Sequence, residues 1–170
     1  VQSGNIMGYF TLDTGSQVDV IVKQTEKGKI LDTVTLRKSD NTAVTAECRN
    51  NTFSFTMPDD VVTLDSVTWK NDDRAHYEIG TSAENTEGEP IDAVYCSADV
   101  KVNGFTDSAA AEGDSVELTL KTGTHPCYDY KLERWVYDKA VLTDAQVDPE
   151  TKTLTFTMPK QAVSVKAVYK

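Results

Sequence analysis

A block of sequence containing Phe-Thr-Met-Pro occurs twice in this 170-residue chain. Residues 52–67 read TFSFTMPDDVVTLDSV, and residues 153–168 read TLTFTMPKQAVSVKAV. Apolar and polar side chains alternate before each proline, which is typical of a strand with one buried face. The strand ends at proline, because proline cannot donate to a strand ladder, and a second apolar strand follows. Such a hairpin cannot bury its apolar face alone, so each block must pack on other strands of its own copy.

The match between the copies extends upstream of this block. GSQVDVIVK begins at Gly15 and GDSVELTLK begins at Gly113, and each is a glycine-led turn followed by period-two alternation. A strand-like segment lies in the middle of each copy, at residues 32–38 and 129–137. The sequence therefore predicts a mainly β protein made of two tandem, small, β-rich modules that are built from hairpins.

The repeat also predicts where the modules lie. Residues 1–72 form the first module, whose opening strand is short or truncated, and residues 93–170 form the second. Residues 73–92 are polar and are interrupted by glycine and proline, so they are expected to be a linker or an edge-strand segment.

The charge of the chain excludes several kinds of partner. There are 27 acidic residues against 17 Lys and Arg, for a net charge of −10, which repels phosphate backbones and anionic lipid headgroups. We therefore expect no nucleic-acid partner. No apolar stretch approaches the roughly 18 residues that span a bilayer, so no membrane insertion is expected either. Val1 is not followed by a signal peptide, and the Thr-, Val-, Asp- and Ser-rich composition favours a piece of an exported protein over an intracellular one.

The tripeptide Asp13-Thr14-Gly15 suggests an enzyme, because aspartic proteases carry their active carboxylate in this motif. Such an enzyme needs two carboxylates that share a proton, from two lobes or from a homodimer. The second copy has Ala111 where the first has Asp13, so the partner carboxylate is missing from this chain. We therefore interpret Asp13 and Gly15 as turn residues, and a protease acting through Asp13 stays a remote alternative.

Other reactive residues form no recognisable catalytic or metal-binding pattern. His76 and His125 lie in polar segments of different copies, and the acidic clusters lack the ligand spacing of a calcium loop. The cysteines are Cys48, Cys96 and Cys127. They lack C-x-x-C spacing and are either unpaired thiols or include a Cys96–Cys127 disulfide. No catalytic residue, metal or cofactor is predicted.

The order of these motifs resembles the divergent internalin B-type repeat family of Gram-positive cell-surface proteins. The second copy carries the whole pattern: ADVKVNGF, AEGDSVELTL, YKLERW, LTFTMP and AVSVKAVYK. The first copy matches from Gly15 to Val22 and from Phe53 onward, but it lacks the Trp and most of the opening strand. The resemblance implies a small β-rich module related in shape to a β-grasp and strung in tandem, without catalytic residues.

The resulting prediction is a non-catalytic structural or adhesive segment, a stalk or spacer, of an extracellular protein at the bacterial cell wall or surface. Its partners are neighbouring repeat modules and an unknown host or cell-wall glycan or protein. The alternative is a glycan- or protein-binding module with an exposed aromatic platform of Trp135, Tyr137, Tyr128 and Tyr130. Exposure of Trp135 to solvent favours the platform, and burial of Trp135 favours the spacer.

Overall fold

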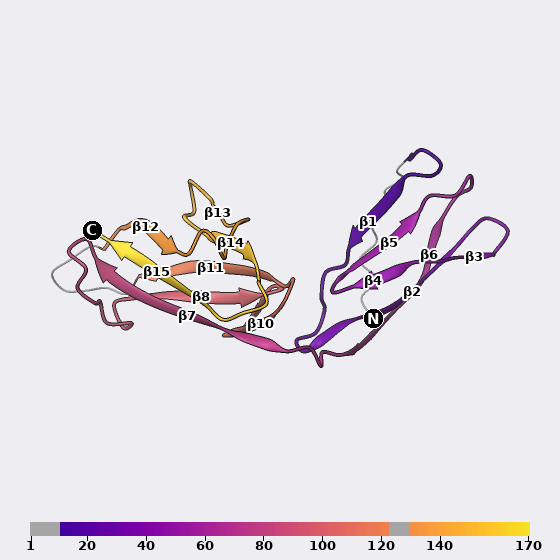
Figure 1. The fold of residues 1–170 in the computed structure, drawn as a ribbon. Helices are drawn as coiled ribbons and strands as arrows, with labels where there is room; N and C mark the ends of the chain where they lie inside the picture. The colour runs from indigo at the N-terminus through magenta and orange to yellow at the C-terminus, as the bar shows by residue number, and fades with distance from the viewer. Residues whose placement is uncertain (1–10, 123–129) are drawn as a thin grey trace. The chain divides into compact units, whose positions relative to one another are not determined.

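The computed structural model describes residues 11–122 and 130–170 (Figure 1). These residues form strands and turns, and no helix occurs among them, so the predicted mainly β fold is confirmed. In particular, the described residues include no helix that is long and apolar enough to cross a membrane. The chain divides into two compact units, unit 1 covering Val1–Asp72 and unit 2 covering Asp73–Lys170.

The described part of unit 1 consists of two three-stranded sheets, with strand orders β1-β5-β4 and β3-β2-β6. The strands are β1 (Gln17–Ile21), β2 (Lys29–Arg37), β3 (Ala43–Val44), β4 (Glu47–Arg49), β5 (Thr52–Thr56) and β6 (Thr63–Asn71). The sheets bury a small core that consists of Leu31, Val34, Leu36, Phe53 and Phe55. Phe53 and Phe55 point to one face of β5 because side chains alternate along a strand, and their ring centroids lie 6.2 Å apart. Trp69 of β6 packs against this core while half-buried.

Unit 2 is larger and consists of a five-stranded sheet, β13-β14-β11-β8-β9, and a four-stranded sheet, β10-β7-β15-β12. The strands are β7 (His76–Asn85), β8 (Cys96–Val102), β9 (Phe105–Thr106), β10 (Ala109–Ala111), β11 (Ser115–Thr122), β12 (Leu132–Tyr137), β13 (Gln146–Val147), β14 (Leu154–Thr157) and β15 (Val163–Tyr169). The largest fully buried side chains are Tyr169, Leu118, Leu154, Met158, Val116, Val165, Val168 and Cys96.

The sequence repeat is also a structural repeat. In unit 1, β1 pairs with β5 and Val18 lies opposite Phe55; in unit 2, β11 pairs with β14 and Val116 lies opposite Phe156. The pairing of β4 with β5 recurs as β13 with β14, and that of β2 with β6 recurs as β12 with β15. Unit 2 adds β8 beside β11 and β7 beside β15. Both units therefore share one strand plan, and unit 2 extends it at two sheet edges.

Part of the segment 73–92, which was expected to be a linker or an edge strand, forms a strand of unit 2. Residues 76–85 form β7, which lies between β10 and β15 in the four-stranded sheet. Ile79 of β7 is only 4% exposed and belongs to the core of unit 2. The polar side chains that suggested a linker alternate with Tyr77 and Ile79, as in a strand with one solvated face.

Candidate functional site

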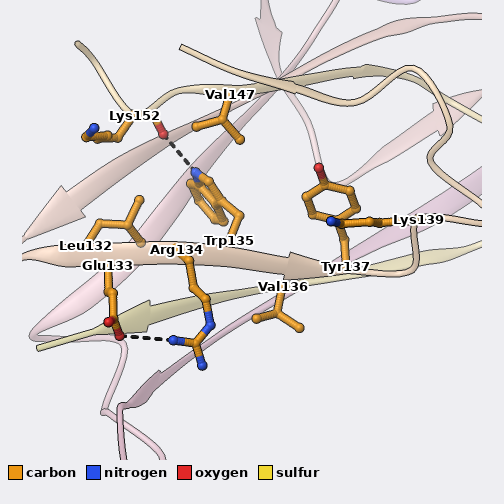
Figure 2. A pocket seen from close by; sticks show the side chains of 9 residues that line it. All are labelled: Leu132, Glu133, Arg134, Trp135, Val136, Tyr137, Lys139, Val147 and Lys152. Carbon is orange, nitrogen blue, oxygen red and sulfur yellow. Dashed lines mark hydrogen bonds and ion pairs between the residues drawn. The ribbon is translucent and has the colours of Figure 1, made fainter. Parts of the chain in front are cut away.

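A hollow of about 460 Å³ lies beside β12 in unit 2 (Figure 2). It is lined by Leu132, Glu133, Arg134, Trp135, Val136, Tyr137, Lys139, Val147 and Lys152. The lining combines apolar side chains of β12 with residues of β13 and of the turn that follows it. It therefore includes two of the four aromatic residues that were candidates for a binding platform.

Trp135 forms one wall of this cavity, yet its side chain is buried and hydrogen-bonded within the fold. It is 8% exposed, and its indole N–H donates a hydrogen bond to the backbone carbonyl of Lys152 at 2.8 Å. Lys152 ends a turn whose backbone has a φ of 60°, in the left-handed region that few non-glycine residues adopt. The indole thus satisfies a carbonyl in a strained turn, so this N–H is not available to a ligand.

The same turn is held from its other end by Asp148. Its carboxylate accepts hydrogen bonds from the backbone N–H groups of Glu150 and Thr151, at 2.8 and 2.7 Å. These bonds hold the pKa of Asp148 below its usual value. The wall of the cavity opposite β12 is therefore a turn ordered by its own hydrogen bonds.

The other platform candidates lie apart. Tyr137 is half-buried and lines the cavity with Trp135, whereas Tyr130 packs edge-to-face on Tyr169, with ring centroids 6.3 Å apart. Tyr128 lies outside the described residues. The described candidates do not form one exposed aromatic surface.

The rim of the cavity is charged and mostly basic. Arg134, Lys139 and Lys152 contribute three cations, and Glu133 contributes one anion. Glu133 forms an ion pair with Arg134 at 3.0 Å, and the Lys152 ammonium donates to the Pro149 carbonyl at 2.6 Å. In a chain of net charge −10, this rim is a local basic region around an apolar floor.

Asp13 lies in a turn that both units share. The Ser16 N–H donates to the Asp13 carbonyl at 3.1 Å, as the Asp114 N–H does to the Ala111 carbonyl at 3.1 Å. Gly15 and Gly113 follow at φ values of 84° and 86°, and glycine adopts this conformation without steric cost. Asp13 is exposed, and its counterpart in the second turn is an alanine. The structure thus places Asp13 in the turn that its sequence predicted.

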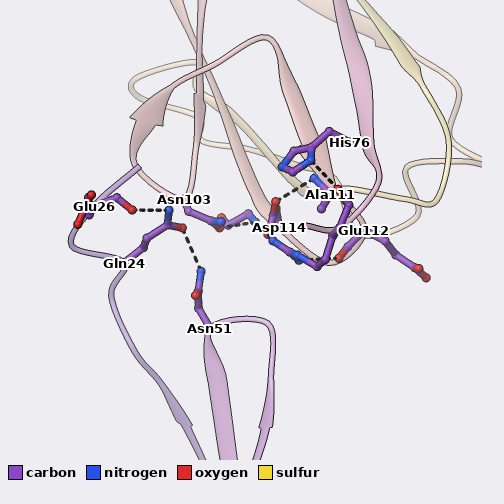
Figure 3. A network of polar contacts seen from close by, with 10 residues as sticks. Gln24, Glu26, Asn51, His76, Asn103, Ala111, Glu112 and Asp114 are labelled. Atoms are coloured by element: carbon purple, nitrogen blue, oxygen red, sulfur yellow. Dashed lines mark hydrogen bonds and ion pairs between the residues drawn. The ribbon is translucent and has the colours of Figure 1, made fainter. Parts of the chain in front are cut away.

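An ion pair with a buried carboxylate, that of Asp114 in unit 2, went unrecognised in the sequence; Figure 3 shows Asp114 beside Ala111 and Glu112. Asp114 is 3% exposed, and its carboxylate accepts from the Arg74 guanidinium at 2.8 Å and from the Ala111 N–H at 2.9 Å. Arg74 also donates to the Glu112 carbonyl at 3.3 Å. These bonds connect the segment before β7 to the turn before β11. The available signal was the substitution of Ser16 in the first copy by an acidic residue in the second.

The remaining candidates are the cysteines and the acidic residues of unit 1, and their contacts fit a structural role. Cys96 is 1% exposed and Cys48 is half-buried, and desolvation raises the pKa of both thiols, which makes them less reactive. A Cys96–Cys127 disulfide stays a prediction, because Cys127 lies outside the described residues. The Asp60 carboxylate of unit 1 accepts from the Ser39 hydroxyl at 2.7 Å, and this bond lowers the pKa of Asp60.

Comparisons with known proteins identify the family of unit 2. A scan of protein-family models matches residues 96–170 to the divergent InlB B-repeat domain. The match begins at the first residue of β8 and runs to Lys170, so β7 lies outside it. Neither the curated proteins nor the solved structures that were searched contain a match. The family resemblance of the motif order GDSVELTL, YKLERW, LTFTMP and AVSVKAVY is thus confirmed, and residues 96–170 match the divergent InlB B-repeat domain.

Proposed function

We propose that this chain is a non-catalytic spacer segment of a bacterial cell-surface protein, which holds other parts of that protein away from the wall. The observation that carries this proposal is that two units with one strand plan follow each other in one chain. Stacking of similar small modules is the usual way to build length from a repeated unit. The acidic exterior, with a net charge of −10, keeps such an array soluble.

The burial and the hydrogen bond of Trp135 support the spacer function over a binding module. An aromatic platform needs exposed rings, whereas the Trp135 ring is buried and its N–H is bonded to the Lys152 carbonyl. The carboxylates of Asp114, Asp60 and Asp148 each accept hydrogen bonds from other groups of the fold. Each of these contacts fits a folded support better than a reactive centre.

The experiment that tests the spacer is a replacement of residues 73–170 within the longer surface protein. An unrelated folded module of equal end-to-end length is expected to restore binding of whole cells to their target, whereas simple deletion of these residues is expected to reduce it. Loss of binding on replacement as well as on deletion would show that the sequence of unit 2 is needed for recognition. An antibody to the chain should stain intact cells.

The cavity beside β12 favours a second candidate, a weak binding module for a glycan or protein segment. Its apolar floor and basic rim suit an amphipathic ligand with a negative charge. Trp69→Phe leaves Trp135 as the sole tryptophan, so iodide quenching reports on this site alone. The spacer predicts weak quenching that no member of a glycan panel changes. Strong quenching that an anionic glycan suppresses would favour the binding module.

A further inference from the structure

The first and last strands of unit 2 pair directly with each other. β7 opens the unit and β15 closes it, and the two are parallel, from Ile79 beside Val163 to Asn85 beside Tyr169. Parallel strands form evenly spaced hydrogen bonds, so this pair is a continuous ladder. The chain therefore enters the unit at one end of the ladder and leaves it at the other end.

These two strands are the inner strands of their sheet, whose order is β10-β7-β15-β12. β10 pairs antiparallel with His76, Tyr77 and Glu78, which precede the part of β7 that pairs with β15. β12 covers the outer edge of β15, from Leu132 opposite Tyr169 to Tyr137 opposite Val165. β12 therefore pairs with β15 along the ladder, whereas single backbone hydrogen bonds, such as that from the Ile91 N–H to the Ala83 carbonyl at 2.9 Å, are made on the other side of β7.

Side chains add to the connection between the two strands. The Lys166 ammonium of β15 lies 2.7 Å from the Glu84 carboxylate of β7, and both side chains are partly shielded from solvent. On the core side, Ile79 of β7 and Val165 of β15 are 4% and 0% exposed and belong to one cluster. The ladder is therefore supported by an ion pair and by core packing.

We propose that unit 2 is a mechanically resistant module in which the ladder between β7 and β15 resists tension along the chain. Force applied at the two ends of the unit pulls β7 and β15 past each other along their common axis. All the hydrogen bonds of the ladder are then loaded together, and none can break alone. Because forced unfolding is governed by the unfolding rate, a barrier that requires simultaneous rupture gives high resistance. The role of this resistance on a cell rests on the proposed spacer function.

Unit 1 provides the contrast within the same chain. Its first and last described strands, β1 and β6, lie in different sheets, so no ladder joins them. Tension must pass between these sheets through side-chain packing and connecting turns. The described part of unit 1 is therefore expected to unfold at a lower force than unit 2.

The test is single-molecule stretching of the whole chain between two handle modules of known strength. Unfolding releases roughly 330 Å of contour length from unit 2 and roughly 210 Å from the described part of unit 1, at about 3.4 Å per residue, so the two events can be told apart. The longer release is expected at a severalfold higher force than the shorter one. An equal or lower force for unit 2 overturns the proposal.

A second pulling direction on the unaltered fold is the matched control. Handles attached at residue 87 and at the C-terminus pull from the end of the ladder where Asn85 lies beside Tyr169. The bonds then open one after another, and unit 2 is expected to unfold at a severalfold lower force than with end-to-end pulling. Equal forces in the two directions also overturn the proposal of mechanical resistance. Equal forces would not contradict the spacer function. That function is tested by the module replacement, whose outcome is the binding of whole cells and not an unfolding force.

Discussion

At the scale of single residues, Asp114 presents a buried charge that needs compensation. The Arg74 guanidinium and the Ala111 N–H supply it, at 2.8 and 2.9 Å. Arg74→Met leaves the carboxylate buried without its cation, and we expect a loss of about 3–5 kcal/mol in the free energy of unfolding. Urea unfolding followed by Trp135 fluorescence in a Trp69→Phe background measures it. A loss below about 0.5 kcal/mol, typical of surface substitutions, would contradict a compensating role for Arg74.

The control for this prediction comes from the other unit, where Ser16 occupies the equivalent of Asp114. Adding Asp114→Ser to Arg74→Met removes the uncompensated charge and restores the residue type of the first turn. The double variant is therefore expected to be more stable than Arg74→Met alone, since removing both partners of a buried pair costs less than removing one.

The phenol of Tyr169 makes unit 2 sensitive to alkali. The side chain is 0% exposed, and within residues 11–122 and 130–170 its hydroxyl has no hydrogen-bond partner. Burial, with a smaller contribution from Cys96, raises the pKa of Tyr169 to about 12. A tyrosine of the unfolded chain ionises near pH 10, so the folded state retains its proton to higher pH. This stabilisation is complete below about pH 10 and is lost as the pH rises toward 12.

Tyr169→Phe tests this assignment. Wild type is expected to lose up to about 2 kcal/mol of stability between about pH 9 and about pH 11.5 through this group, and the variant should lose less. Urea unfolding at the two pH values gives the difference. Tyr137→Phe, which alters a half-buried tyrosine of the same unit, should keep the wild-type loss. Equal losses in wild type and Tyr169→Phe would refute the role of this phenol.

At the scale of secondary-structure elements, β7 decides where the stable module begins. The family match starts at residue 96, but β7 pairs with β15 and contributes the buried Ile79. A fragment of residues 96–170 would expose one edge of β15 and the core beneath Ile79. We expect residues 73–170 to unfold cooperatively and residues 96–170 to be far less stable, by circular dichroism and urea titration.

A point variant separates the core contribution of β7 from its pairing. Ile79→Ala in the whole chain is expected to cost about 2–5 kcal/mol, the usual range for truncating a buried isoleucine. Thr81→Ala, at an exposed position of the same strand, should change stability little. If residues 96–170 prove as stable as residues 73–170, then β7 is dispensable and this boundary is wrong.

Elements that depend on neighbouring residues could be predicted from the sequence, and elements that depend on distant residues could not. Val18 and Val20 in one copy, and Val116 and Leu118 in the other, alternate locally, so β1 and β11 could be predicted from neighbouring residues alone. The pairing of β7 with β15 joins segments that are far apart in sequence, and alternation cannot specify such a partner.

The candidate site could likewise be predicted only where it depends on neighbouring residues. Trp135 could be singled out as an aromatic residue of a strand, but its bond to the Lys152 carbonyl depends on a turn that only the folded chain creates. The ion pair of Arg74 with Asp114 likewise joins two polar segments that look solvated when read separately. Local patterns therefore predicted strands and turns, whereas long-range polar contacts were missed.

At the scale of the whole molecule, each unit has its own core and its own tryptophan. Phe55 belongs to the buried cluster of unit 1, against which Trp69 packs, and Phe156 belongs to that of unit 2, which includes Trp135. A spacer benefits from this division, because unfolding of one module leaves the next intact. The two units are therefore expected to unfold as separate cooperative transitions, each reported by one tryptophan.

Core truncations in either unit test this independence. Phe55→Ala, measured with Trp69 as the probe in a Trp135→Phe background, should lower the urea midpoint by the equivalent of about 3–5 kcal/mol. The same substitution in a Trp69→Phe background should leave the Trp135 transition in place, and Phe156→Ala should give the reverse pattern. A spacer made of autonomous modules requires this separation. If Phe55→Ala shifted the Trp135 transition as much as the Trp69 transition, the two units would be one cooperative domain rather than successive modules.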